Sequence, residues 1–374
     1  MRRPKPHKRA ALLKDERIVT TVKQIPVADL MQNRSILFYL ITLTPVIMLY
    51  SAVVRGGYWV PGALIYMTLF AAFCDEAFAL DFTKTDDGWG ARSVLPIILG
   101  ISHFALLPLA IYALGTAAFG LLTKIVLFFA FGLFFGMISH ANAHEMIHRT
   151  NRLHSSFGKW IFISMLFGHH TSAHLLVHHP YVATPKDPNS ARFNESFYTF
   201  LKRASIAEFR AGLRAENTRL EKRGLLPTSL RNPYWQYCLG ALVAILLVYG
   251  LSGLKGVIVY LALSFYAQSQ MLIIDYVQHY GLQRKQLDTG KFEPVSPCHS
   301  WNAPHWFSAF MTLNAPRHSD HHASPAKPYT ELDGFTDTAP QLPHAIPYMA
   351  AVALWPRRWR AMMNPRAKLW QHRS

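Results

Sequence analysis

Eight of the 19 histidines lie in three short boxes whose spacing suits metal binding. The boxes hold His144 and His148 in HEMIH, His174, His178 and His179 in HLLVHH, and His318, His321 and His322 in HSDHH. On a helix, residues three or four positions apart share a face, so each box presents two or three ring nitrogens on one side. A single histidine is usually a hydrogen-bonded core or surface residue. Three clustered boxes instead predict a metal site, because neutral imidazole is the commonest metal ligand.

A ninth histidine, His279 in DYVQHYGL, stands outside the boxes and is predicted to join them. Nine ring nitrogens are too many for one ion, so the set favours two. Imidazole binds zinc, copper, iron and nickel, and ligand type alone does not identify the metal. No catalytic side chain beyond these ligands is expected.

Several polar residues near the boxes are candidates for supporting the ligands. Asp187 and Asp320 could accept hydrogen bonds from ligand imidazoles and fix their tautomers, as groups behind metal ligands commonly do. Glu145, inside the first box, is a further candidate for this role. His140 and His170 each lie four residues before a predicted ligand. They are candidates for the same role or spare ligands, with a polar helix flank as the favoured alternative.

The box HEMIH also fits two other metal-site patterns. It matches HExxH, in which the glutamate activates a zinc-bound water, and LDG at 332–334 is similar to the third-ligand motif of intramembrane site-2 proteases. Glu145 and His148 form an ExxH, as in ferritin-like di-iron bundles. The protease pattern leaves seven histidines unused and puts LDG in a polar tail, and the ferritin-like pattern lacks a second ExxH. An intramembrane zinc metalloprotease is kept as the alternative from a different class.

Long apolar segments of the chain must position the histidine boxes. The chain is 51% hydrophobic and only 16% charged, whereas a soluble domain carries about 25% charged residues. A hydrocarbon core of about 30 Å needs about 20 helical residues to cross it. Six stretches come close to that length: 35–54, 58–78, 94–115, 121–139, 235–254 and 257–274. We therefore predict an all-α integral membrane protein, a bundle of six transmembrane helices. A metal transporter is disfavoured, because His103 is nearly alone among polar ligands at depth.

The distribution of basic residues predicts the orientation. Residues 1–35, 140–234 and 276–374 hold 33 of the 38 lysines and arginines, and such an excess marks cytoplasmic segments. Both termini are then cytoplasmic, with the protein in the inner (plasma) membrane of a bacterium. The predicted organisation is a basic cytoplasmic N-terminal segment, 1–34, and one membrane domain, 35–374. The cytoplasmic cap of that domain comprises 140–234 and 275–374, so all nine histidines lie on one side.

The position of His279 agrees with this arrangement. If the sixth span ends near Ile274 and continues as a helix, His279 lies about 7 Å beyond it, at about 1.5 Å per residue. His144 lies the same number of residues beyond Ser139, the predicted end of the fourth span. Both helices should therefore deliver an imidazole at one level.

Composition also excludes several classes of protein. The net charge of +17 is explained by basic cytoplasmic segments, and no nucleic-acid motif accompanies it. The three cysteines are scattered, which argues against a disulfide framework or a thiolate metal site. No GxGxxG follows a strand, so a bound nicotinamide or flavin dinucleotide is not expected. Residues 200–232 are predicted to form an amphipathic helix, and WPRRWRAMMNPR from Trp355 an interfacial segment with tryptophan at the headgroups.

Several motifs together resemble the membrane-bound alkane 1-monooxygenases, relatives of the integral-membrane fatty acid desaturases. The matching pieces are HEMIHR, HHPYVATPKDPNSARFNES, DYVQHYGLQR, HSWN at 299–302 and RHSDHHASPAKPYTEL. They occur in order over most of residues 140–370. The resemblance implies a non-haem centre of two iron ions held by nine histidines, which match the nine named above.

The second histidine box departs from the family pattern, and this departure leaves the substrate open. In alkane hydroxylases the second box usually follows a glutamate and carries polar residues. This chain has Ala173 before the box and the apolar Leu175, Leu176 and Val177 inside it. Xylene-type monooxygenases also tolerate alanine there. Aromatic-methyl hydroxylation and fatty acyl desaturation therefore stay as alternatives on the same fold.

The resemblance implies O2-dependent hydroxylation of the terminal carbon of medium-chain alkanes or similar hydrocarbons. The substrate would come from the lipid bilayer. Two external electrons are required, and the chain has no cofactor motif to supply them. A rubredoxin or ferredoxin with its reductase is the expected donor, and a basic cytoplasmic face would steer such an acidic partner.

Overall fold

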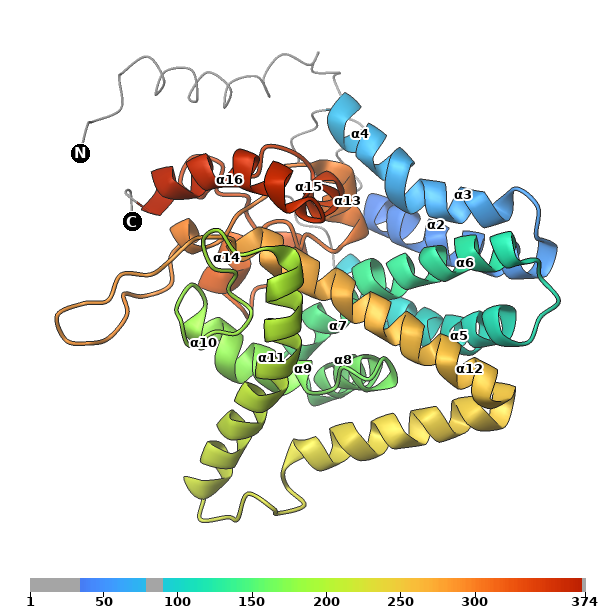
Figure 1. Ribbon diagram of the computed structural model, residues 1–374, viewed down its shortest axis with the longest axis horizontal. Coiled ribbons are helices and arrows are strands. Elements are labelled where there is room, and N and C mark those ends of the chain that lie inside the picture. The colour runs from blue at the N-terminus through green and yellow to red at the C-terminus, as the bar shows by residue number, and fades with distance from the viewer. Residues whose placement is uncertain (1–33, 79–89, 372–374) are drawn as a thin grey trace.

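A computed structural model describes residues 34–78 and 90–371 of the chain. Over these ranges the protein is helical, and the only extended pairings are the isolated bridges Gln286–Phe292 and Asn302–Gln341. The long apolar helices run together on the right of the molecule in Figure 1. The shorter elements lie at the left-hand ends of these helices. The predicted all-α class is confirmed. Residues 1–33 of the predicted N-terminal segment lie outside the described ranges.

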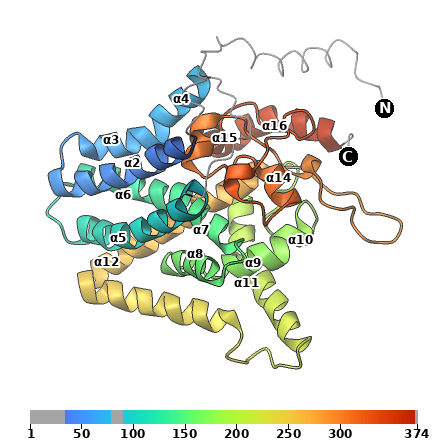
Figure 2. The ribbon, with the colours of Figure 1, turned by 180° about the vertical axis from the view of Figure 1, so that it is seen from behind.

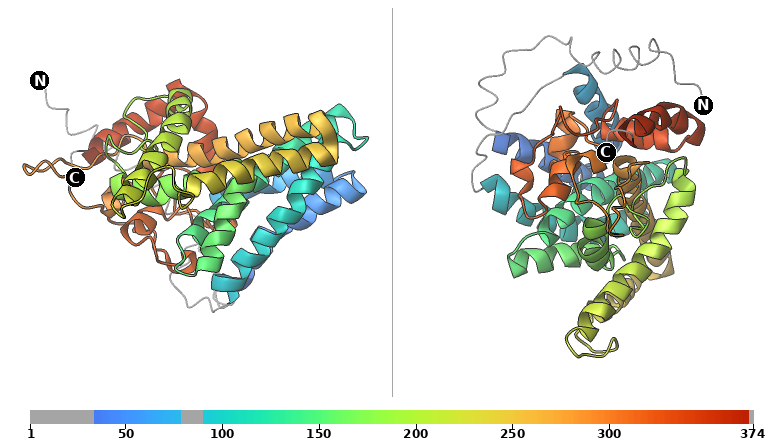
Figure 3. Two further views of the ribbon diagram at one scale, coloured as in Figure 1. Left: turned by 90° about the horizontal axis from the view of Figure 1, so that it is seen from below. Right: turned by 90° about the vertical axis from the view of Figure 1, so that its left-hand side faces the viewer.

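The apolar half is built from helices joined by short connections. Its elements are α2 (Arg34–Arg55), α3 (Trp59–Ile65), η3 (Tyr66–Phe70), α4 (Ala71–Ala77), η4 (Gly90–Val94), α5 (Leu95–Gly115), α6 (Leu121–Leu133), η5 (Phe134–Ser139), α7 (His140–Ile147) and α12 (Pro233–His279). Helices α2, α3, α5, α6 and α12 pack against one another in this half. Seen from below, the two yellow-orange arms of α12 run side by side (Figure 3, left).

The remaining helices form the cap at the other end. They are α8 (Arg152–Ser164), α9 (His170–Ala173), η6 (His174–His178), α10 (His179–Tyr181), α11 (Phe197–Glu221), η7 (Pro297–His299), α13 (Trp306–Met311), α14 (His318–Ala323), η8 (Tyr329–Glu331), α15 (Ile346–Ala353) and α16 (Pro356–Gln371). From behind, α13, α15 and α16 cover one side of the cap and α8 to α11 the other (Figure 2).

Five helices of the described chain are long and apolar enough to cross a membrane. They are Ser35–Arg55, Trp59–Ala77, Ala91–Gly115, Leu121–Ile147 and Pro233–His279. The first four coincide with four predicted spans. The fourth is longer than predicted, because the helix continues through η5 and α7 to Ile147 and carries His144 on its last turns.

The fifth helix, α12, covers both remaining predicted spans. Its 47 residues are interrupted at Gly253, whose φ of 60° and ψ of −161° are not helical. Glycine adopts positive φ without steric cost, so the chain can bend there. Two arms of α12 meet at this bend (Figure 1). A crossing of the membrane by each arm, and so the count of six spans, stays a prediction.

Buried aromatic residues pack the cap against the C-terminal end of α12. Trp359 of α16 is fully buried, and its ring centroid lies 5.2 Å from those of Tyr276 and Tyr280. Trp301 is also buried and donates from its indole nitrogen to the carbonyl of Tyr280. Trp359 therefore packs inside the cap, whereas the sequence predicted tryptophans at the lipid headgroups; Trp355 is 60% exposed.

Candidate metal centre

All nine predicted histidines come together in two adjacent groups. The first group contains His144, His148, His174, His179 and His321, and the second contains His178, His279, His318 and His322. Within each group, one ligand atom per residue lies within 4.8 Å of all the others. The boxes and the isolated His279 are thus brought to one place, from α7, η6, α10, α12 and α14.

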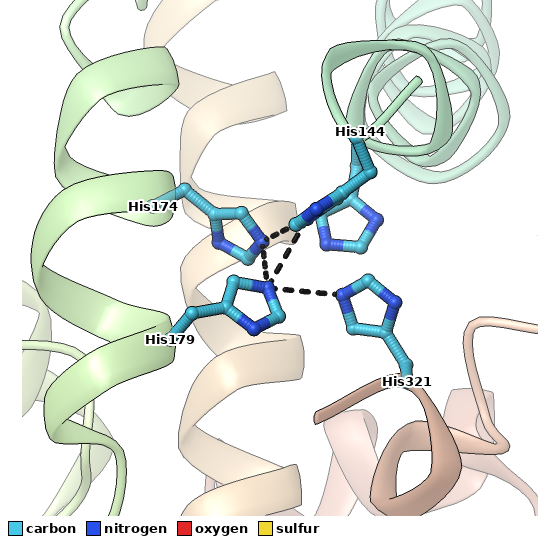
Figure 4. Close-up of side chains that lie close together, drawn as sticks. His144, His174, His179 and His321 are labelled. Carbon is cyan, nitrogen blue, oxygen red and sulfur yellow. Dashed lines mark hydrogen bonds between the residues drawn. The ribbon is translucent and has the colours of Figure 1, made fainter. Parts of the chain in front are cut away.

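In the first group the ring nitrogens converge on a common centre (Figure 4). The Nε2 atom of His179 lies 2.9 Å from that of His174 and 3.1 Å from those of His148 and His321. His174 and His148 are 3.0 Å apart at Nε2. A neutral imidazole has one donor and one acceptor nitrogen, so this many mutual contacts cannot all be hydrogen bonds. A cation at the centre would satisfy them together.

The second group is fully buried. Nε2 of His318 lies 3.0 Å from Nε2 of both His279 and His322. The His178 ring centroid is 4.9 Å from that of His279 and 4.8 Å from that of His322. Within the described chain, Nε2 of His178 is buried without a hydrogen-bond partner, so its lone pair is available to a metal ion.

The two groups touch each other, which fits a centre of two metal ions. The ring centroids of His179 and His322 are 4.6 Å apart. All the converging atoms are imidazole nitrogens, a donor set suited to iron, zinc, copper or nickel. The residues present therefore fit the pair of metal ions that the sequence predicted.

Local helix geometry explains how the second box serves both groups. Segment η6 is a π-helix, whose hydrogen bonds run from residue i to i+5, and such segments occur frequently at functional sites. The wider turn brings His174 and His179, five residues apart, into one group, while His178 faces the other. In a regular α-helix, residues three or four apart share a face, so the sequence did not predict the pairing of His174 with His179.

Burial keeps most of the imidazoles in the cap neutral. It lowers the pKa well below its usual range, and neighbouring imidazoles lower it further, for His148, His174, His179, His318, His321 and His322. A neutral ring keeps a lone pair for a metal ion. Burial would also lower the pKa of His178, but the Asp187 carboxylate raises it overall.

Asp187 lies behind His178, where the sequence placed a supporting carboxylate. Its Oδ2 is 2.9 Å from Nδ1 of His178 and also accepts a hydrogen bond from the Ser190 hydroxyl. Burial would raise the pKa of Asp187, but His178 and these hydrogen bonds lower it overall. An ionised carboxylate only accepts, so the proton sits on Nδ1 of His178 and Nε2 faces the group. Asn189 extends the network to Asp275, at 2.8 Å.

His170 has a carboxylate partner that was not predicted from the sequence. Its Nδ1 lies 2.5 Å from Glu208 of α11, and its ring stacks on that of His174 at 5.1 Å. Glu208 and Glu216 belong to a buried stripe of every fourth residue that is otherwise apolar or small: Phe200, Ala204, Gly212 and Leu220. This spacing was visible in the sequence and would have marked both glutamates as buried.

The other candidates lie near the groups with different partners. Asp320 is 2.5 Å from the Lys327 ammonium and accepts from the Asp333 amide. Glu145 pairs with Arg149 at 2.5 Å. His140 is buried against the rings of Phe162 and Phe167. Their supporting role stays a prediction.

Comparison with known proteins agrees with this geometry. The sequence profile of the fatty acid desaturase family matches residues 119–352. Alkane 1-monooxygenase 2 of Alcanivorax borkumensis is 35% identical over 277 residues, 74% of this chain and 72% of that protein. Alkane 1-monooxygenase 1 of Pseudomonas aeruginosa is 32% identical over 83% of this chain and 84% of that protein. The chain belongs to the alkane 1-monooxygenase family. A xylene/toluene monooxygenase hydroxylase component of Pseudomonas putida is also similar, at 27% identity over 85% of both chains.

Proposed function

We propose that this membrane monooxygenase hydroxylates the terminal carbon of medium-chain alkanes or similar hydrocarbons with O2. The observation that carries the proposal is the convergence of nine histidines in a chain of this family. The overall reaction is R–CH3 + O2 + 2 e⁻ + 2 H⁺ → R–CH2OH + H2O. One oxygen atom enters the C–H bond, and the other leaves as water.

The metal is proposed to be iron, two ions per chain. The five-histidine group would hold one ion and the four-histidine group the other. When bound, the two irons supply the reduction of O2 and the oxidation of an unactivated C–H bond. The electrons come from an external rubredoxin or ferredoxin with its reductase.

The described side chains support this chemistry by holding the ligands and excluding water. Asp187 fixes the tautomer of His178, and such partners raise metal affinity by holding ring orientation. The hydroxyl of Ser300 lies 3.5 Å from Nδ1 of His279. Six of the nine ligand side chains belong to buried residues, so competing water is kept from most of the centre.

The setting is proposed to be the bacterial inner membrane, with both termini and the cap in the cytoplasm. Apolar helices deliver His144 and His279 directly from the membrane half to the centre. A hydrocarbon dissolved in the bilayer would therefore reach the centre between these helices without crossing water.

Hydroxylation of an aromatic methyl group is the second candidate. It is favoured by Ala173, which stands where alkane hydroxylases usually carry glutamate, and by the similarity to the xylene/toluene enzyme. A zinc protease is less well supported, because all nine histidines are used and Glu145 is paired with Arg149.

Product analysis with isotopic O2 tests the function. Cells that express the chain with a rubredoxin system should convert a medium-chain alkane to its 1-alcohol with one oxygen atom from O2. An alkene without the label would indicate desaturation instead. Preferred turnover of xylene over octane would favour the aromatic substrate.

Metal analysis tests the centre separately. Purified protein should carry close to two iron ions per chain and little zinc. One zinc ion per chain, with peptide cleavage that Glu145→Gln abolishes, would support the protease instead.

A further inference from the structure

A basic hollow lies beside the second histidine box, on the cap. It has a volume of about 590 Å³ and is lined by Leu176, Val177, Tyr181, Lys186, Ala211, Arg214, Ala215, Thr218, Arg219, Lys222 and Arg223. A second hollow follows along α11 and shares Arg214; Lys202 and Arg210 also line it. None of these residues belongs to the proposed metal ligands.

The basic character of the hollow follows from how α11 is turned. Glu208 and Glu216 point inward, where they contact His170 and Ser172. Arg210, Arg214 and Arg219 lie on the exposed side of the helix. Two of the three acidic side chains of α11 are therefore withdrawn from the surface, and the outward face keeps a large excess of positive charge.

The floor of the hollow is apolar and leads to the metal centre. Leu176 and Val177 belong to η6, between His174 and His178, so part of this apolar floor is the helix that carries ligands of both groups. Ala211 and Ala215 of α11, which packs against η6, add to this apolar floor. The protein is thus only about one helix thick between this surface and the imidazoles.

We propose that this hollow is the docking site of a small acidic one-electron iron–sulfur protein, and this rests on the proposed function. Electron transfer slows steeply with distance, so a donor must dock where the protein over the centre is thin. An apolar floor inside a charged rim is the usual anatomy of a protein interface. Two reduced donor molecules dock in turn, each loses one electron, and together they supply the two electrons of one turnover.

Charge complementarity selects an acidic partner. Rim residues Lys186, Arg214, Lys222 and Arg223 are exposed and attract an acidic surface over a distance set by salt. Such steering raises association rates more than it raises final affinity. Anionic lipid headgroups share this charge, but they do not explain an apolar floor that leads to the ligand helix.

Direct binding tests the proposal without requiring turnover. The variant Arg214→Glu/Lys222→Glu is compared with Lys285→Glu/Lys291→Glu, which changes net charge equally on the exposed loop near 285–291. Each full-length protein, in nanodiscs of neutral lipid, is titrated with a purified acidic rubredoxin at low salt. The first variant should bind at least about tenfold more weakly than wild type, a difference of about 1.4 kcal/mol. The control variant should bind as wild type does, and the difference should shrink as salt is added.

Measuring turnover with two different reductants distinguishes failure of the docking proposal from failure of the proposed function. The docking variant should show a raised KM for rubredoxin but unchanged product formation with a small chemical reductant. Equal rubredoxin affinity in wild type and docking variant would overturn the proposal. Equal rubredoxin affinity combined with lost dependence on anionic lipid would assign the hollow to headgroups. Normal rubredoxin binding by wild type with no hydroxylated product from either reductant would reject the proposed function and leave the docking site standing.

Discussion

At the residue scale, His279 is the most informative ligand because it stands outside every box. Its Nε2 lies 3.0 Å from that of His318, and its ring also contacts those of His178 and His322. Removing this imidazole should leave the second group with three ligands. We expect His279→Ala to fold and insert but to lose iron and nearly all activity.

The matched control is His344→Ala. His344 lies on the cap surface, where its Nδ1 is 3.3 Å from Glu76. Its loss should leave iron content and turnover unchanged. Iron analysis of both purified variants, with size-exclusion profiles to verify folding, checks the prediction. If His279→Ala contained as much iron as wild type, His279 would have only a packing role, and the nine-ligand proposal would be wrong.

The Asp187 carboxylate should matter through His178 and not through direct contact with the metal. In Asp187→Asn the amide can donate as well as accept, so the His178 tautomer is no longer fixed. Loss of such a partner typically lowers metal affinity about 10- to 100-fold. Competition with a chelator measures the change, and Asp288→Asn on an exposed loop is the control. Equal iron retention in both variants would contradict a supporting role for Asp187.

The candidate ligand residues were easier to predict from the sequence than the side chains that contact them. The nine histidines were recognisable because clustered imidazoles are rare outside metal sites. The pairing of Asp187 with His178 was proposed, but the equally plausible Asp320 contacts Lys327. Spacing along the chain did not distinguish these two, because the difference depends on how separate loops fold back on the cap.

At the element scale, helix type decides which histidines meet. A regular α-helix would place His174 and His178 on one face, whereas the π-helix η6 unites His174 with His179. Segment η6 packs against α11 and carries ligands of both metal groups. Hydrophobic periodicity predicted where helices lie, but it did not predict this change of hydrogen-bond register.

The contact between α7 and α8 gives a test at this scale. A Cβ on Gly158 of α8 would lie 2.7 Å from both the Ala143 carbonyl oxygen and Met146 Cβ. Gly158→Ala should therefore push α8 away from the helix that carries His144. We expect a loss of about 1–3 kcal/mol in stability, with a lower Tm and less bound iron.

Gly250→Ala is the matched control for this prediction. A Cβ there meets nothing within 4 Å, and the position lies inside α12. Alanine is a better helix former than glycine by about 1 kcal/mol, so this variant should be neutral or slightly more stable. A Gly158→Ala protein as stable as wild type would show that the two helices can separate at no cost.

At the scale of the whole molecule, the bend in α12 determines where the two ends of this helix lie. A straight helix of 47 residues would be about 70 Å long at about 1.5 Å per residue, more than twice the hydrocarbon thickness. The bend at Gly253 instead returns the chain, so that both ends of α12 lie toward the cap (Figure 1). If the cap is cytoplasmic, residues near the bend must face the opposite side of the membrane.

Labelling with a membrane-impermeant thiol reagent tests this topology. In a background with serine at Cys74, Cys238 and Cys298, single cysteines replace Lys255, just beyond the bend, or Lys222, at the end of α11. Lys255→Cys should react in intact spheroplasts, because the predicted orientation puts the bend outside. Lys222→Cys should react only after permeabilisation, because the predicted orientation puts the cap in the cytoplasm. The reverse pattern would invert the predicted orientation, and protection of both sites in intact cells would mean that the two arms of α12 do not each cross the bilayer.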